Sequence, residues 1–498
     1  MDEENELIAL RRQKLETLRT RGVAPFGQSF ERSGSIEEVR AKFAEGTKLR
    51  AAGRITAHRD MGKSHFLDLR DATGRIQIYV QAKELGPEAM EIFGLLDLGD
   101  FIGMEGSCFL TKTGEQTLKV HRFEVLAKAL RPLPEKWHGL TDVEARYRQR
   151  YLDLVTNERS REVFTKRIAI LRETREFMQS RGFLEVETPM LQTVAGGAAA
   201  EPFRTHHKAL GLDLYLRIAP ELYLKRLLVG GFNKVFEVNR NFRNEGISRR
   251  HNPEFTMLEG YWAYANFEKV AELVEELICH LAQAVGPDEH ASAHPETGGS
   301  SSLRVEHRDP DGNLTRTLDL TRPWRRARYR DLVCGVAGTD WFDLTSEQRR
   351  AKCAGLGVEV QPQMADFEVT QHVFEKLIEE KTFDPLFVTH CPKELVPLAK
   401  QNPEDDSLVD VFELIINGQE IAPGYSELND PLVQRQRLLE QAGEETQKLD
   451  EDFLLALEHG MPPAGGFGLG IDRLTMLLTG AESIRDVILF PLLRPKRD

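Results

Sequence analysis

The spacing of apolar residues changes from helical to strand-like along the first third of the chain. Leucines recur at helical spacing between residues 4 and 21, and Gly22 and Pro25 end the pattern, which predicts a helix. From about 49 to 130, apolar and polar residues alternate in short runs punctuated by glycines, as is typical of strands. Several short strands in one small domain fit a Greek-key barrel of the OB type.

Cations and aromatic residues are interspersed among these predicted strands. They are Arg54, Arg59, Lys63, Phe66, Arg75 and Tyr79. Stacking of bases and contact with phosphates require this mixture, so one face of the barrel is a candidate for binding single-stranded nucleic acid. A barrel that binds only protein, or that only supports the structure, fits the same pattern.

Helical periodicity returns after residues 131–141, which contain two prolines and a glycine and read as a linker. Helices are expected over 142–154 and 158–181, and a further helical stretch over 343–382. The second helix carries an apolar stripe formed by Phe164, Ile168, Leu171 and Met178.

Composition limits the class of protein. The chain has 498 residues, 41% of them hydrophobic and 29% charged, which predicts a soluble protein with more than one core. The net charge of −13 argues against a protein that coats nucleic acid, but it allows a local basic groove. Five cysteines without a CxxC spacing, an acidic start and no long apolar run indicate a cytoplasmic chain that does not bind membranes.

The first group of chemically active residues lies on a predicted strand pair. Alternation predicts a strand over 234–243 whose polar face carries Glu237, Asn239, Asn241 and Arg243. A returning strand over 254–261 places on one face Phe255, Met257, Glu259 and Tyr261. If the two faces line one pocket, it offers a guanidinium for phosphate or carboxylate and an aromatic platform for a purine. A polar sheet face held by salt bridges is the alternative.

The second group lies on a predicted hairpin. Asn417-Gly418 between two strand-like runs is a strong signal for a two-residue turn, in which 416 opposes 419, 415 opposes 420 and 413 opposes 422. Glu413 and Glu420 then share a face with Ile415 and Ala422. Two carboxylates this close repel each other unless a cation lies between them, and Mg²⁺ bridging nucleotide phosphates fits. Two solvated glutamates are the alternative.

The third group is the glycine-rich stretch GFGLG (466–470), followed by a helix expected to begin near Asp472. Such glycines allow a helix to pack closely on a sheet or a ligand to approach the backbone. Arg473 at a helix start opposes the helix dipole and therefore requires an anion nearby, such as a phosphate.

Taken together, these stretches resemble the signature motifs of class II aminoacyl-tRNA synthetases, and in detail those of the bacterial lysyl enzymes. GFLEVETPML (182–191) is similar to motif 1, the dimer-interface helix and strand. FRNEG (242–246) with RHNPEF (250–255) is similar to motif 2. GFGLGIDR (466–473) is similar to motif 3, with Asp472 where most of the class has Glu. The resemblance covers about residues 49–495.

The resemblance implies an α+β chain with an N-terminal OB-type β-barrel and a class II antiparallel sheet flanked by helices. The domains are then an N-terminal helical extension (1–48), an anticodon-binding OB domain (49–130), a linker (131–141) and a catalytic domain (142–498) with a helical insertion around 343–382.

The resemblance also implies the roles of individual residues. The catalytic residues are Arg243 and Arg473. Lysine is bound by Gly197, Glu221, Arg243, Glu259, Tyr261, Tyr425 and Glu427. ATP is bound by Arg243, Glu245, Arg250, His251, Asn252, Phe255, Glu413, Glu420 and Arg473. The Mg²⁺ ligands are Glu413 and Glu420, and the residues that read the anticodon are Phe66 and Gln77.

The implied activity is ATP-dependent activation of L-lysine to lysyl-adenylate and transfer to the 3′ end of tRNA(Lys) by a homodimer. A buried lysine ammonium is tolerated only when it is paired, and two carboxylates with a tyrosine hydroxyl satisfy that requirement. Two departures from the family pattern are Pro423, where an amide contact is expected, and Val396, where a serine is expected.

Three alternatives remain open from the sequence. One is a catalytically inactive paralogue, and another is a relative that transfers lysine to a protein, although such relatives lack the front barrel. The third is a class II enzyme for aspartate or asparagine, which Glu221 and Glu427 in the side-chain pocket oppose.

Overall fold

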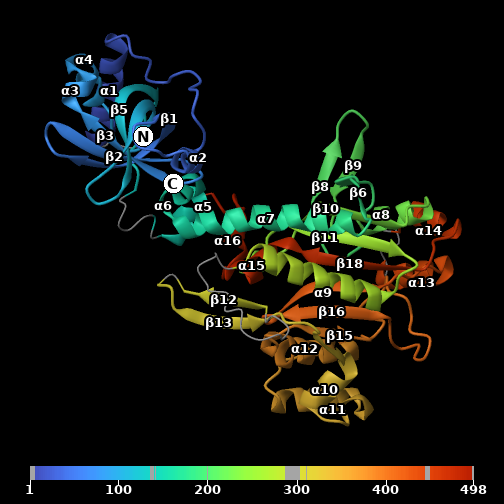
Figure 1. Cartoon of the computed structure of the whole chain (residues 1–498). Coiled ribbons are helices and arrows are strands. Elements are labelled where there is room, and N and C mark those ends of the chain that lie inside the picture. Colours follow the sequence, from blue (N-terminus) through green and yellow to red (C-terminus); the bar gives the residue numbers. More distant parts are fainter. Residues whose placement is uncertain are drawn as a thin grey trace. The chain divides into compact units, whose positions relative to one another are not determined.

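The computed structural model describes residues 6–134, 140, 142–198, 200–286, 303–309, 311–442 and 449–495. The chain forms two compact units, Met1–Thr141 and Asp142–Asp498 (Figure 1). Most of the expected linker, at 135–139 and 141, lies outside the described residues. No helix in the described part of the chain is long and apolar enough to cross a membrane.

The first unit is a closed five-stranded barrel in the strand order β1-β2-β3-β5-β4, which confirms the expected OB-type architecture. Its strands are β1 (Lys48–Asp60), β2 (Ser64–Arg70), β3 (Arg75–Gln81), β4 (Phe101–Leu110) and β5 (Gln116–Ala127). Its helices are α1 (Glu6–Thr20), α2 (Ile36–Ala41), α3 (Ala82–Leu85) and α4 (Pro87–Phe93). The barrel interior is apolar because every second residue of each strand points inward, as with Leu67, Leu69, Ile76 and Ile78.

The second unit is built on an eight-stranded sheet in the order β14-β15-β16-β17-β18-β11-β10-β6. The strands are β6 (Leu184–Glu185), β10 (Lys234–Phe242), β11 (Glu254–Ala263), β14 (Arg325–Arg328), β15 (Leu386–Thr389), β16 (Val411–Ile416), β17 (Gln419–Ser426) and β18 (Ala464–Gly470). The central pairs are antiparallel and the two edge pairs, β14–β15 and β10–β6, are parallel. This confirms the expected α+β fold.

Smaller sheets and helices surround this sheet. The small sheets contain β7 (Leu191–Gln192), β8 (Arg204–His207) and β9 (Leu212–Leu216), and β12 (Arg304–Arg308) with β13 (Leu314–Asp319). The helices are α5 (Val143–Arg148), α6 (Arg150–Thr156), α7 (Glu158–Ser180), α8 (Glu221–Val229), α9 (Phe267–Ala284), α10 (Tyr329–Ala337), α11 (Ser346–Gly355), α12 (Asp366–Leu377), α13 (Pro431–Ala442), α14 (Glu451–Glu458), α15 (Ile471–Thr479) and α16 (Ile484–Val487). Two 3₁₀ turns are η1 (Trp341–Asp343) and η2 (Glu379–Lys381).

One face of the large sheet forms the core of the second unit with α7, α9 and α15 (Figure 1). Phenylalanine and glycine alternate across the strands on this face, because the register pairs Phe236 with Gly260, Gly260 with Phe467, and Phe467 with Gly424. A Cβ atom at Gly260 would lie 2.6 Å from the Phe467 ring. The glycines therefore give the large rings the space to lie flat against neighbouring strands.

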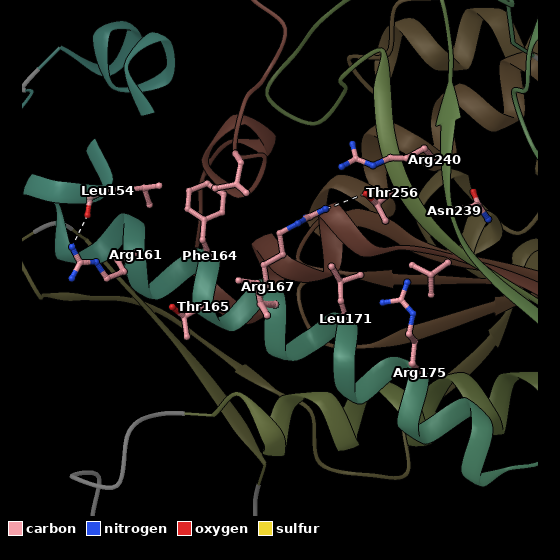
Figure 2. Close-up of a pocket in the computed structure, with 13 residues that line it drawn as sticks. Leu154, Arg161, Phe164, Thr165, Arg167, Leu171, Arg175, Asn239, Arg240 and Thr256 are labelled. Atoms are coloured by element: carbon pink, nitrogen blue, oxygen red, sulfur yellow. Dashed lines mark hydrogen bonds between the residues drawn. The ribbon is translucent and has the colours of Figure 1, made fainter. Parts of the chain in front are cut away.

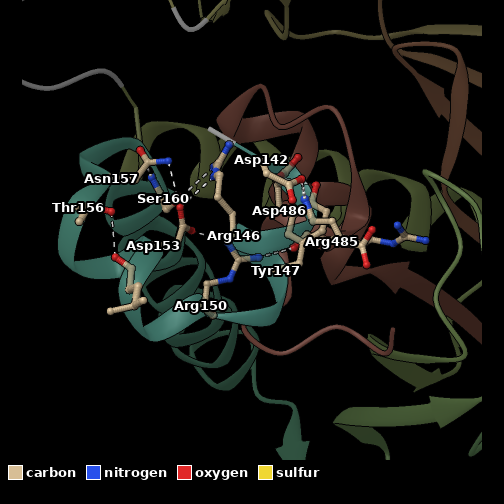
Figure 3. A network of polar contacts seen from close by, with 12 residues as sticks. Asp142, Arg146, Tyr147, Arg150, Asp153, Thr156, Asn157, Ser160, Arg485 and Asp486 are labelled. Carbon is tan, nitrogen blue, oxygen red and sulfur yellow. Dashed lines mark hydrogen bonds and ion pairs between the residues drawn. The ribbon is translucent and has the colours of Figure 1, made fainter. Parts of the chain in front are cut away.

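A buried polar network fixes the start of α7 (Figure 3). The fully buried guanidinium of Arg150 pairs with Asp153 at 2.6 Å and donates hydrogen bonds to the carbonyls of Arg485 and Leu489. Since arginine presents several donors in a fixed fork, one side chain joins α6 to the C-terminal segment.

The apolar stripe expected on α7 is only partly correct. Phe164 and Met178 are buried, but Ile168 is 66% exposed. The helical period identifies residues that share a face, but it does not tell which part of that face the same chain covers.

Candidate active site

The face of the large sheet opposite the core carries most of the residues expected to act on substrate. On β18, Phe467 and Leu469 point to the core, so Gly466, Gly468 and Gly470 lie on the opposite face. Gly466 pairs with Tyr261 on one side and Tyr425 on the other. A Cβ atom at Gly466 would lie 2.0 Å from Glu427 Oε1, so any larger residue at this position would displace the Glu427 carboxylate.

The side-chain end of the expected lysine site is a buried cluster of charges. Glu221, at the start of α8, and Glu427, just after β17, are both nearly inaccessible to solvent. Between them lies Lys225, whose Nζ is 2.7 Å from Glu221 Oε1 and 2.5 Å from Glu427 Oε2. The Tyr425 hydroxyl donates to Glu221 at 2.8 Å. The cluster therefore holds two carboxylates against one ammonium group.

Burial and the neighbouring charges shift the pKa values of the ionisable groups in this cluster. Burial and the charge of Glu221 raise the pKa of Glu427 to about 8, while Lys225 opposes the rise. Burial disfavours the charge of Lys225, but Glu221 and Glu427 outweigh it, so the pKa of Lys225 is raised. Both oxygens of Glu427 are buried; Oε2 contacts the Lys225 ammonium, whereas Oε1 has no hydrogen-bond donor among the described residues. Buried negative charge of this kind requires a positively charged partner.

From this cluster the expected lysine site continues to Tyr261 and Glu259 on β11. The Tyr261 hydroxyl lies 3.4 Å from Glu259 Oε2, and Asn241 Nδ2 lies 3.5 Å from Glu259 Oε1. Burial and the charges of Glu221 and Glu237 raise the pKa of Glu259 to about 8. Gly197 lies beside Glu221, because a Cβ atom at Gly197 would come within 3.2 Å of the Glu221 Cβ. The structure thus brings together all the residues expected at the two amino groups of lysine.

The expected nucleotide site lies at the far end of β10 and β11. The Arg243 guanidinium lies over the Phe255 ring at 5.1 Å from its centroid. Arg473, at the start of α15, donates to the Glu420 carbonyl at 2.9 Å and lies 3.2 Å from His251 Nε2. Burial lowers the pKa of His251, and the positive charge of Arg473 lowers it further.

The motif 2 loop meets the turn of the β16–β17 hairpin. Arg250 donates to the Gly418 carbonyl at 2.8 Å, which joins the loop to the turn. Burial lowers the pKa of Arg243. Glu245 is exposed, and its negative charge partly offsets this decrease. Asn252 is buried, and its amide donates to the Glu254 carbonyl of the adjoining strand.

The hairpin forms at the predicted turn, with Asn417 and Gly418 both at positive φ. Its register is partly different from the prediction. Residue 416 opposes 419 and 415 opposes 420, but a bulge at Ile421 places Glu413 opposite Pro423 and Ala422 opposite Leu414. Ala422 therefore lies in the core and does not share a face with Glu413.

Glu413 and Glu420 remain on the same face in the bulged hairpin. Burial and the charge of Glu420 raise the pKa of Glu413 to about 8, with a smaller effect of Glu379. Glu379, in η2, accepts a hydrogen bond from the Glu420 backbone amide at 3.2 Å. These carboxylates repel each other, and oxygen-rich sites of this kind suit a magnesium ion. No group of three or more His, Cys, Asp or Glu side chains able to hold a metal is present among the described residues.

Asp472 has a structural position at the start of α15. Its Oδ2 accepts the Thr256 amide at 2.8 Å, and its Oδ1 lies 2.6 Å from Arg167 on α7. One short carboxylate therefore links α7, β11 and α15, and it fixes the helix from which Arg473 projects.

Sequence reasoning missed two residues of the site, Lys225 and Glu379. Lys225 follows Glu221 by four residues in a helix, a spacing that favours an ion pair and was the available signal. Glu379 lies in the region expected to be a helical insertion, and nothing in its local sequence indicates its contact with Glu420.

In the first unit, Phe66 and Gln77 lie on one face of the barrel. The register pairs Phe66 with Tyr79 and Asp68 with Gln77, so these four side chains point the same way. The rings of Phe66 and Tyr79 are 4.9 Å apart, and Gln77 accepts a hydrogen bond from Thr117 at 2.9 Å. Arg59 and Arg75 flank the same face beside Asp68.

Comparison with family models agrees with this division of the chain. Residues 142–494 match the model of tRNA synthetases class II (D, K and N). Residues 49–126 match the OB-fold nucleic acid binding domain.

Similar proteins cover the whole chain. A lysine–tRNA ligase of Pelotomaculum thermopropionicum is 50% identical over 99% of this chain and 96% of its own length. Those of Listeria innocua and Moorella thermoacetica are 47% and 46% identical over 99% and 100% of this chain, and over 98% and 100% of their own length. The family expected from the three motifs is confirmed, and the chain belongs to the class II tRNA synthetases of the D, K and N group, among relatives that are lysine–tRNA ligases.

Proposed function

We propose that this protein is a lysine–tRNA ligase, which activates L-lysine with ATP and transfers it to tRNA(Lys). The observation that carries the proposal is the excess of buried carboxylate at Glu221 and Glu427, which have a single ammonium group between them. The side-chain ammonium of a bound lysine supplies the missing positive charge. An aspartate or asparagine side chain would leave one of these two carboxylates without a cation, and the similarity to lysine–tRNA ligases supports the same choice.

The positions of the charged groups support one orientation of the substrates. The ε-ammonium of lysine lies among Glu221, Glu427 and the two tyrosine hydroxyls, and its α-ammonium is held by Glu259 and Gly197. Its carboxylate then faces Arg243. Adenine stacks between Phe255 and Arg473, with the phosphates toward Arg250 and His251.

In the first step the lysine carboxylate attacks the α-phosphorus of ATP, the bond to the β-phosphate breaks, and pyrophosphate leaves. Arg243 and Arg473 stabilise the charge that builds on the phosphate oxygens, and Arg243 also orients the attacking carboxylate. In the second step the terminal ribose hydroxyl of tRNA attacks the adenylate carbonyl and AMP leaves. Both steps depend on positioning, so no side chain is required as nucleophile.

Glu413 and Glu420 would hold Mg²⁺. Their carboxylates share a face, and burial together with the charge of Glu420 raises the pKa of Glu413, which supports a site that takes up a cation. When bound, the ion neutralises charge on the nucleotide phosphates.

The first unit is proposed to bind the anticodon of the tRNA. Phe66 offers a ring for stacking, and Gln77 offers an amide for hydrogen bonding to a base edge on the same face. A cytoplasmic location also remains a prediction.

The second unit is proposed to form a homodimer through the α7 region. A cavity of about 520 Å³ lies along this helix, lined by Phe164, Ile168 and Leu171 together with arginines (Figure 2). The nearby motif 1 segment exposes Leu184, Met190 and Leu191. Exposed apolar side chains next to charged groups are typical of a protein interface.

The direct test of the function is ATP–pyrophosphate exchange with each of the twenty amino acids, with magnesium and without tRNA. Lysine alone is expected to support exchange, because only its side chain neutralises Glu221 and Glu427. Charging of tRNA(Lys) by the same preparation then tests the second step. Exchange with another amino acid and not with lysine would contradict the proposal.

The magnesium site is tested by Glu413→Gln, which keeps the shape of the side chain and removes its charge. Exchange is expected to fall at least about hundredfold, because stabilisation of the phosphate charge is lost, while tRNA binding is kept. The surface variant Glu458→Gln is the matched control. Phe66→Ala should show the opposite pattern, with normal exchange and weaker charging of tRNA. Full exchange activity in Glu413→Gln would rule out the metal assignment.

The homodimer is tested by sedimentation analysis of the protein and of Ile168→Lys. The wild type is expected to sediment as a dimer and the variant to shift toward the monomer, because a charge would be buried in the interface. A monomeric wild type would contradict the assignment.

A further inference from the structure

Lys225 is the most completely buried cation of the proposed lysine site. Its side chain has no exposed surface, its Nζ contacts Glu221 and Glu427, and it lies 5.6 Å from the centroid of the Tyr425 ring. The helix α8 fixes its position, because Glu221 lies one turn earlier on the same helix. Lys225 therefore contacts the same two carboxylates that are proposed to bind the substrate ammonium.

The ratio of two carboxylates to one ammonium group distinguishes this cluster from an ordinary buried salt bridge. A structural pair joins one cation to one anion, and even that arrangement is weak support for stability. Here one ammonium serves two carboxylates, and Glu259 is a third buried carboxyl group nearby. A fold that needed only a buried pair would not need the second carboxylate.

We propose that Lys225 is a positioning and specificity-determining residue, which fixes Glu221 and Glu427 and leaves these groups with one net negative charge. This inference rests on the proposed function. With both carboxyl groups ionised, the form that a bound ammonium favours, two carboxylates and one ammonium sum to −1, which equals the charge that one substrate ammonium neutralises. The site is thus set for a substrate side chain with a single positive charge.

Lys225 is expected to have opposite effects on lysine binding in the wild type and in Glu427→Gln. With both carboxylates present, Lys225 offsets their mutual repulsion and holds them in place. When Glu427 is replaced by Gln, Lys225 already neutralises Glu221, so the substrate ammonium meets a neutral site. Removing Lys225 from that variant frees Glu221 to bind lysine.

The test is therefore kcat/KM for lysine in ATP–pyrophosphate exchange. Glu427→Gln is expected to lower it at least about hundredfold, because a buried ammonium loses its free partner. Adding Lys225→Met to Glu427→Gln is expected to raise it at least about tenfold, while KM for ATP stays constant. In the wild-type background Lys225→Met is expected to raise KM for lysine. The double variant keeps the net charge of −1, now carried by Glu221 alone with the Tyr425 hydroxyl as its donor, and circular dichroism checks that it folds.

The matched control adds Lys234→Met to Glu427→Gln. Lys234 is also a lysine of the second unit, but its ammonium lies over the Trp262 ring, and its loss should give no recovery. Failure of Lys225→Met to raise kcat/KM in the Glu427→Gln background would show that Lys225 has only a structural role. Absence of lysine-dependent exchange in the wild type would instead contradict the proposed function, and the inference with it.

Discussion

Incompletely compensated negative charge in the interior is the constraint on which the proposed active site depends. Glu221, Glu427 and Glu259 are nearly inaccessible to solvent, and Lys225 is the cation that contacts two of them. Burying charge is unfavourable unless each group is paired, so the site is complete only when a ligand brings positive charge. Buried carboxylates without enough cations destabilise this region when no ligand is bound. The same carboxylates favour a ligand that carries an ammonium group over one that does not.

A single sheet supports this site and the hydrophobic core on its two faces. Alternation along β18 sends Phe467 and Leu469 to the core and leaves glycines on the other side, where Glu427 lies against Gly466. Asp472 then ties the end of this strand to α7 and β11. Packing on one face thereby holds the charged groups of the other face at fixed distances, which is what a reaction that depends on positioning requires.

Much of this arrangement was predictable from local patterns. Alternation identified β10 and β11 with the correct faces, and Asn417-Gly418 identified the hairpin turn. The bulge at Ile421 was not predictable, because the residues of the turn do not specify it. It places both Ile421 and Ala422 in the core. Lys225 was missed because lysines are seldom fully buried, and only the fold shows that two distant glutamates meet it.

The proposed function depends on selection of the substrate ammonium group by buried carboxylates. Calorimetric titration with lysine and with norleucine, which has a similar side chain without the ammonium group, tests it most directly. Lysine is expected to bind at least about a thousandfold more tightly, because with norleucine Lys225 is the only cation for the two carboxylates of Glu221 and Glu427. Binding of norleucine within about tenfold of lysine would contradict it, since shape alone would then suffice.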